Sequence, residues 1–80
     1  MIRVLFDDAI ELAIRYGMDK GGMASVSVSW NPYLGSFQAE ASWSDNVRLV
    51  GEAFREPEDA LASLIARLEI EIEASNSNIL

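Results

Sequence analysis

The sequence predicts an α+β domain with the order α-β-β-β-α, in which an antiparallel three-stranded sheet has two helices packed on one face. Three observations predict it. Near both ends of the chain, apolar residues recur at three- and four-residue spacing, which is typical of amphipathic helices. Between these segments the spacing changes to two, which is typical of strands with one buried face. The length of 80 residues allows one domain, residues 1–80.

The first helix is predicted over residues 3–16. Its apolar stripe comprises Leu5, Ala9, Leu12, Ala13 and Tyr16. The pair Asp8 and Glu11 also fits a capping box, which would start the helix later and leave residues 2–6 extended, but we favour the earlier start. Gly17 is suited to end the helix, because glycine is the preferred residue just after a helix C-cap.

Three strands are predicted in the middle of the chain. At 24–30 apolar residues alternate with serines, and at 37–43 aromatic residues and alanines alternate with polar residues. The third strand, 47–54, is less regular, and Gly51 marks a bulge or a close backbone approach. We therefore expect an antiparallel meander whose serine-rich face stays in water.

Large apolar side chains gather near the ends of the first hairpin. Trp30 and Trp43 fall on the apolar faces of their strands and are expected in the core. Tyr33 and Leu34 lie in the turn at 31–35, where packing is least demanding. Exposed there, they would be interface anchors. The alternative is that they fold back onto their own hairpin.

The last helix is predicted to begin at Pro57, because proline at the first helical position and acidic neighbours suit a helix N-terminus. Its apolar stripe comprises Leu61, Leu64, Ile65, Leu68 and Ile72. Ile70 lies off this stripe beside Ala62 and Ala66, on a flank that meets either the neighbouring helix or a partner. Residues 75–80 are expected to form a frayed tail.

Composition argues against catalysis. The chain has no histidine and no cysteine, so it lacks the usual general base near neutral pH, a thiolate nucleophile and the commonest zinc ligands. No segment has the spacing of a phosphate-binding or calcium-binding loop. We expect a protein that is not an enzyme, with no catalytic residues, no cofactor and no metal site. No apolar run could span a membrane, and Asp7 and Asp8 interrupt any signal-peptide core, so we expect a cytoplasmic location, in the host cytoplasm if the gene is phage-encoded.

The net charge of −7 predicts a protein partner with a basic surface, and no direct binding of nucleic acid or membrane. Residues 51–80 hold seven acids and two arginines. Acids near a helix C-terminus oppose the helix dipole, at a cost of about 0.3–1 kcal/mol each when exposed, so local stability does not explain them. The candidate partner-binding residues are Glu52, Glu56, Glu58, Asp59, Glu69, Glu71 and Glu73, together with Tyr33, Leu34 and Ile70. The alternative is a solvated face that confers solubility.

The element order resembles that of the double-stranded-RNA-binding domain. That family binds RNA through its first helix, its first hairpin loop and a lysine cluster that opens the last helix. Here the last helix opens with Glu56, Glu58 and Asp59, so the resemblance implies the topology without the RNA binding. Residues 24–73 also resemble HicB-type antitoxins, in which a three-stranded meander precedes a helix that opens with a "PEEAL"-like motif, here Pro-Glu-Asp-Ala-Leu from Pro57.

The favoured hypothesis is a non-catalytic interaction protein that occupies a basic, nucleic-acid-handling site on another protein. In size, charge and lack of cysteine the chain resembles phage-encoded inhibitors of host defence, including anti-CRISPR proteins. One alternative is a HicB-like antitoxin, the partner of a small basic toxin. Another is a structural or assembly protein of a phage particle, which would form homodimers or larger assemblies through the flank of Ala62, Ala66 and Ile70 or through an open sheet edge.

Overall fold

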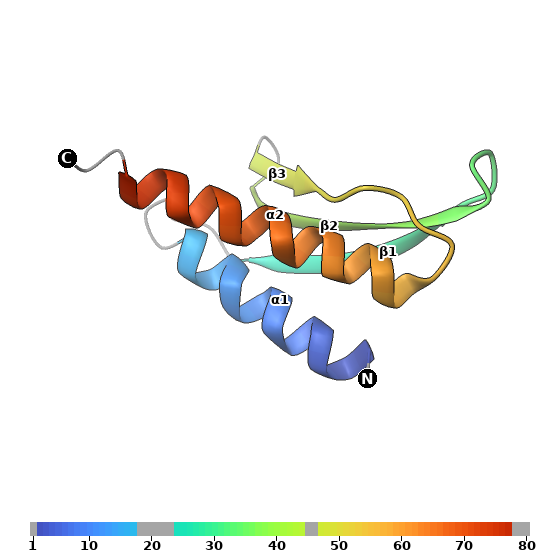
Figure 1. Ribbon diagram of the computed structural model, residues 1–80, viewed down its shortest axis with the longest axis horizontal. Helices are drawn as coiled ribbons and strands as arrows, with labels where there is room; N and C mark the ends of the chain where they lie inside the picture. The colour runs from blue at the N-terminus through green and yellow to red at the C-terminus, as the bar shows by residue number, and fades with distance from the viewer. Residues whose placement is uncertain (1, 18–23, 45–46, 78–80) are drawn as a thin grey trace.

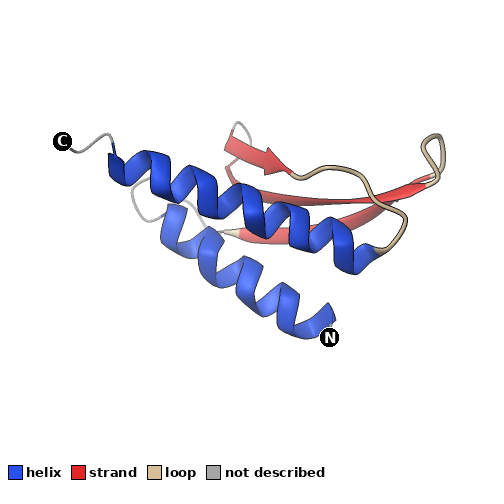
Figure 2. Cartoon of the chain, in the orientation of Figure 1, coloured by secondary structure: helices blue, strands red, loops and turns tan. Residues whose placement is uncertain are grey.

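Two helices cover one face of a three-stranded sheet in the computed structural model of the protein, which describes residues 2–17, 24–44 and 47–77 (Figure 1). The elements are α1 (Ile2–Gly17), β1 (Ser25–Asn31), β2 (Ser36–Ser44), β3 (Val47–Val50) and α2 (Pro57–Ser77). The strands form an antiparallel meander with β2 in the centre. The helices lie side by side, run in the same direction and form one layer over the sheet (Figure 2). The predicted α+β fold and its element order are confirmed.

The start of α1 agrees with the earlier of the two predicted positions. The helix begins at Ile2, so Asp8 and Glu11 lie inside it and do not form a capping box. Residues 2–6 are helical, and the alternative in which they are extended is wrong.

The end of α2 lies later than predicted. The helix continues to Ser77, so residues 75–77 belong to it where a frayed tail was expected, and residues 78–80 lie outside the described residues. As a consequence, Glu69 and Glu71 lie more than one turn before the end of the helix. Because the helix dipole acts mainly within the last turn, it does not penalise these two carboxylates as expected.

The core combines large leucines on α2 with alanines on α1 and β2. The fully buried residues are Ala9, Ala13, Ala39, Ala41, Ala60, Leu61, Leu64 and Leu68. Alanines on α1 and β2 let the backbones approach closely, and the leucines of α2 fill the remaining space. The predicted core-facing stripe of α2 is confirmed at its leucines, whereas Ile65 and Ile72 at its edge are half-buried.

Trp43 is buried, as predicted, and joins the end of α1 to β2. Its ring meets Tyr16 edge-on with 5.1 Å between ring centroids, and its Nε1 donates a hydrogen bond to the carbonyl oxygen of Ala13 at 2.7 Å. Gly17 lies against the same indole, and a Cβ atom at that position would collide with the Trp43 ring. Gly17 ends α1 as predicted, but close packing explains the glycine, because its φ is not positive.

The uncovered face of the sheet is polar. Ser25 on β1 and Ser42 on β2 pair across the strands, and their hydroxyl oxygens lie 2.8 Å apart. On the same face Arg48 of β3 lies 3.6 Å from Glu40 of β2. The expectation that the serine-rich face stays in water agrees with the exposed serines of β1.

The third strand is shorter than predicted. It ends at Val50. Gly51 still donates a backbone hydrogen bond to Ala39 of β2 at 3.0 Å, and the next residue paired with β2 is Phe54, which exchanges two backbone hydrogen bonds with Phe37. The four residues from Glu40 to Phe37 correspond to five residues from Val50 to Phe54, so the second segment carries one extra residue, as in a bulge. This extra residue turns the Phe54 side chain onto the face of the sheet that carries Phe37.

Gly51, at the start of this irregular segment, explains why α2 lies so close to the sheet. It is buried, and a Cβ atom there would lie 2.9 Å from the backbone nitrogen of Leu64. The close backbone approach predicted from this glycine is therefore confirmed. Neither α1 nor α2 combines the length and apolar character that crossing a membrane requires.

Candidate protein-binding surfaces

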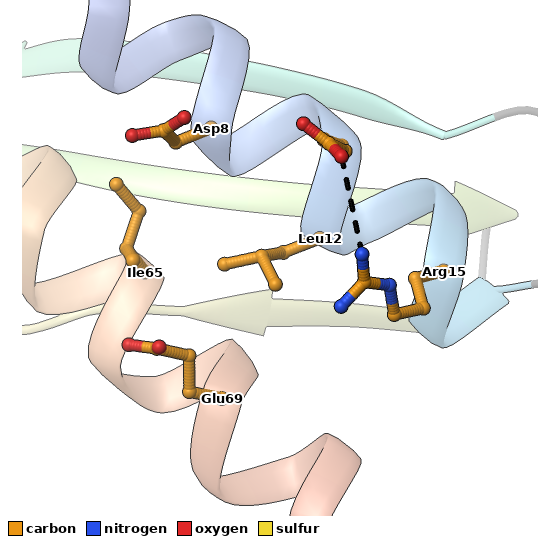
Figure 3. A pocket seen from close by; sticks show the side chains of 6 residues that line it. Asp8, Leu12, Arg15, Ile65 and Glu69 are labelled. Carbon is orange, nitrogen blue, oxygen red and sulfur yellow. Dashed lines mark ion pairs between the residues drawn. The ribbon is translucent and has the colours of Figure 1, made fainter.

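A groove of about 240 Å³ runs between α1 and α2. Leu12 from α1 and Ile65 from α2 form its apolar floor (Figure 3). Asp8 borders it on the α1 side and Glu69 on the α2 side, so carboxylates from two helices face the same space. We call this site the interhelical groove.

The interhelical groove carries net negative charge. Its third carboxylate, Glu11, lies 3.9 Å from Arg15, four residues further along α1. Both side chains are largely exposed, so their attraction is weak and screened by salt. With three carboxylates and one guanidinium around an apolar floor, the groove suits a cationic group attached to an apolar stem, such as arginine or lysine.

The predicted acids of α2 do not form one surface. Glu58, Asp59, Glu69 and Glu73 are exposed, whereas Glu71 is half-buried. Since each residue advances about 100° around a helix, Glu71 lies about 200° from Glu69. It lies 3.9 Å from Arg67, which pairs it with a cation within the same helix.

Glu52 lies on the other side of α2 from the interhelical groove. It lines a second hollow, of about 250 Å³, with Ser63, Arg67 and Ile70. Its backbone N–H donates to the Ser63 hydroxyl at 3.0 Å, which ties the segment after β3 to α2. Ile70 is 62% exposed, so the flank predicted to meet a helix or a partner does not meet α1.

Glu56 belongs to the start of α2. Its carbonyl oxygen accepts the backbone N–H of Ala60 at 3.1 Å, and its side chain is exposed. With Glu58 and Asp59 in the first turn, it places three carboxylates at the end of the helix where the dipole favours negative charge. Local stability therefore favours these three acids even without a partner, and it leaves their exposed side chains available to one.

The far end of the first hairpin is a second candidate surface. Trp30, Phe37 and Phe54 form a row across three neighbouring segments, and the rings of Trp30 and Phe37 meet edge-on at 4.9 Å. Trp30 is 52% exposed, so the expectation that it belongs to the core is wrong. Because paired strand residues share a face, this row lies on the helix-facing side of the sheet. The hairpin extends past the N-terminal ends of both helices, so the helices do not cover its far end (Figure 1).

The turn of this hairpin presents its apolar side chains to solvent. The Asn31 side chain accepts the backbone N–H groups of Tyr33 at 2.9 Å and Leu34 at 3.3 Å, and Gly35 closes the turn with a φ of 62°. Tyr33 is 95% exposed and Leu34 63% exposed, so neither folds back onto the hairpin. We call Trp30, Tyr33, Leu34, Phe37 and Phe54 together the aromatic arm.

Sequence reasoning missed Asp8, Glu11 and Phe54 as site residues. Asp8 and Glu11 share one side of α1, and their spacing could have indicated an acidic flank. That this flank faces Glu69 follows only from how the helices pack. Phe54 reaches the aromatic arm through the extra residue in the segment after Val50, which leaves no clear periodicity in the sequence.

No protein-family model, curated protein or solved structure matches the chain. Within the described ranges, no three acidic side chains lie close enough together to hold a metal ion.

Proposed function

We propose that the protein is a non-catalytic interaction protein whose acidic helical layer occupies a basic, nucleic-acid-handling site on another protein. The observation that carries this proposal is the interhelical groove, in which Asp8 and Glu11 of α1 and Glu69 of α2 surround one apolar floor. A fold that needed these carboxylates only for solubility would have no reason to bring them together, since like charges repel.

The acids continue along the helical layer beyond the interhelical groove. Glu58 and Glu73 are exposed on α2 and lie about 22 Å apart along its axis, given a rise of about 1.5 Å per residue. A row of negative charge of this length is comparable to a short stretch of nucleic-acid backbone. It would steer the protein toward a cleft lined with lysine and arginine.

The first experiment compares affinity capture from nuclease-treated bacterial lysate by the wild-type protein and by groove variants. Asp8→Lys and Glu69→Lys reverse one charge each inside the groove. Asp7→Lys is the matched control, because Asp7 is exposed, is adjacent in sequence and lies about 100° away around α1, outside the groove. We expect the control to retain a nucleic-acid-binding protein and the two groove variants to lose it.

Two further measurements test the recovered complex. Because salt shortens the range of electrostatic attraction, affinity should fall steeply between about 0.1 M and about 0.5 M salt. Free nucleic acid should displace the protein from its partner if both occupy one site. A complex whose affinity does not change with salt and that free nucleic acid does not displace would contradict the proposal. A small basic protein retained at high salt would favour the antitoxin alternative.

A second candidate function is self-assembly through β1. Within the described residues, β1 has a strand neighbour on one side only, and Ser25–Asn31 contains no charged residue and no proline. Such an edge is open to pairing with another strand. Light scattering over a concentration series tests it: Ser27→Lys should abolish any dimer, whereas Ser42→Lys, on the central strand, should leave it intact.

A further inference from the structure

The aromatic arm exposes more apolar surface than the fold requires. Tyr33 and Leu34 contribute nothing visible to the core, and Trp30 leaves half of its surface in water. Adjacent exposed apolar side chains of this size in a soluble protein mark an interaction site. The backbone that carries these side chains is held in place, because hydrogen bonds to Asn31 fix the turn and backbone pairing of Phe37 with Phe54 fixes its base.

The segment that continues from the arm carries net negative charge. Phe54 is followed along the chain by Arg55 and then by Glu56, Glu58 and Asp59 at the start of α2. These three carboxylates outnumber the one guanidinium, so the segment attracts a cation. Of the two cationic side chains, arginine also suits exposed aromatic rings, because its guanidinium group stacks on them.

We propose that the aromatic arm binds an arginine-bearing segment of the partner protein, with Trp30 as the ring on which the guanidinium stacks. Lysine is the poorer ligand, because its compact, strongly hydrated ammonium group cannot stack in this way. This inference rests on the proposed function, because it assumes that the partner has a basic surface. It assigns a second contact to that partner, at the opposite end of α2 from Glu69 and Glu73.

The test titrates an oligoarginine peptide and an oligolysine peptide of equal length into the full-length protein. The chain has two tryptophans, so an amide NMR spectrum reports two indole N–H signals. The Trp30 signal should shift with oligoarginine and much less with oligolysine. The Trp43 signal should stay in place, because that indole is buried and hydrogen-bonded to Ala13.

Variants assign the effect to the arm. Trp30→Leu should weaken oligoarginine binding about fivefold, toward the oligolysine value, as expected for the loss of one cation–π contact. Tyr33→Ala should also weaken it, and it cannot disturb the core because Tyr33 is 95% exposed. Ile14→Ala, which removes an exposed apolar side chain from α1, is the matched control and should change nothing.

Each other outcome overturns the inference in a distinguishable way. If both peptides bind equally and the Trp30 signal does not move, the arm is not the site, while the proposed function of the helical acids survives. If neither peptide binds, the inference about the arm fails, and the capture experiment with the groove variants decides the proposed function separately. If the Trp30 signal depends on protein concentration alone, the arm is a contact between two copies of this chain.

Discussion

The indole of Trp43 donates its N–H to the carbonyl oxygen of Ala13 at 2.7 Å, inside the core. Ala13 lies one turn before the end of α1, at Gly17. The contact therefore satisfies the buried indole N–H and fixes the end of α1 against β2. Since Asp8 and Glu11 lie on the same helix, it also helps to hold the α1 side of the interhelical groove in place.

Replacing Trp43 by phenylalanine should destabilise the protein by about 2–4 kcal/mol, because the variant loses a buried hydrogen bond and leaves a cavity. The free energy of unfolding from urea denaturation measures this. Trp30→Phe is the control, and it should cost less than about 1 kcal/mol because Trp30 is half-exposed. Equal losses in the two variants would contradict the roles assigned to the two tryptophans.

Gly17→Ala should destabilise the protein by about 1–3 kcal/mol, although alanine is the better helix former, because the new methyl group collides with the Trp43 ring. Gly35→Asn is the control. Gly35 has a φ of 62° but nothing within 4 Å of its missing Cβ, and asparagine tolerates this conformation, so the change should be nearly neutral. Thermal unfolding of both variants gives the comparison, and a Gly17→Ala protein as stable as the wild type would contradict the packing described.

Glu69→Lys should stabilise the isolated protein by about 0.5 kcal/mol at low salt while it weakens partner binding. The new cation faces Asp8 and Glu11 across the interhelical groove, and it removes the repulsion between Glu69 and Glu73, four residues apart. Urea denaturation at low and high salt measures the effect, which should shrink as salt is added. A loss of stability would show that Glu69 serves the fold rather than a partner.

Arg48→Ala should change stability by less than about 0.5 kcal/mol, because its ion pair with Glu40 lies on the uncovered face of the sheet and the Arg48 side chain is largely exposed. Glu40→Gln is the complementary variant and should behave alike. Denaturation midpoints of the two single variants and the double variant give the coupling energy. A coupling above about 1 kcal/mol would mean that this pair orders the polar face of the sheet.

Local patterns were sufficient to predict the elements. The three- and four-residue spacing of apolar residues predicted both helices, and the alternation of serines with valines predicted β1, because side-chain direction along each element follows from backbone geometry alone. The close approach at Gly51 was predictable for a related reason, since an isolated glycine in a strand pattern indicates a neighbouring backbone.

The candidate sites were predictable only in part. Exposure of Tyr33 and Leu34 agrees with one of two open alternatives, because a turn leaves few neighbours for its side chains. Trp30 was assigned wrongly, because alternation shows which face of a strand a residue occupies but not how far the helices extend over that face. Glu71 was grouped with Glu69 by closeness in sequence, although the helix places the two on different sides.

The sequence by itself determined the order of the elements, the apolar face of each, the excess of negative charge and the absence of histidine and cysteine. Only the tertiary structure decided that Asp8 and Glu11 face Glu69, and that one extra residue turns Phe54 toward Phe37. It also decided that the first hairpin extends beyond the N-terminal ends of both helices. The physical reason is that periodicity records the direction of a side chain relative to its own backbone. Which elements meet, and where their contact ends, depends on packing between segments far apart in the chain.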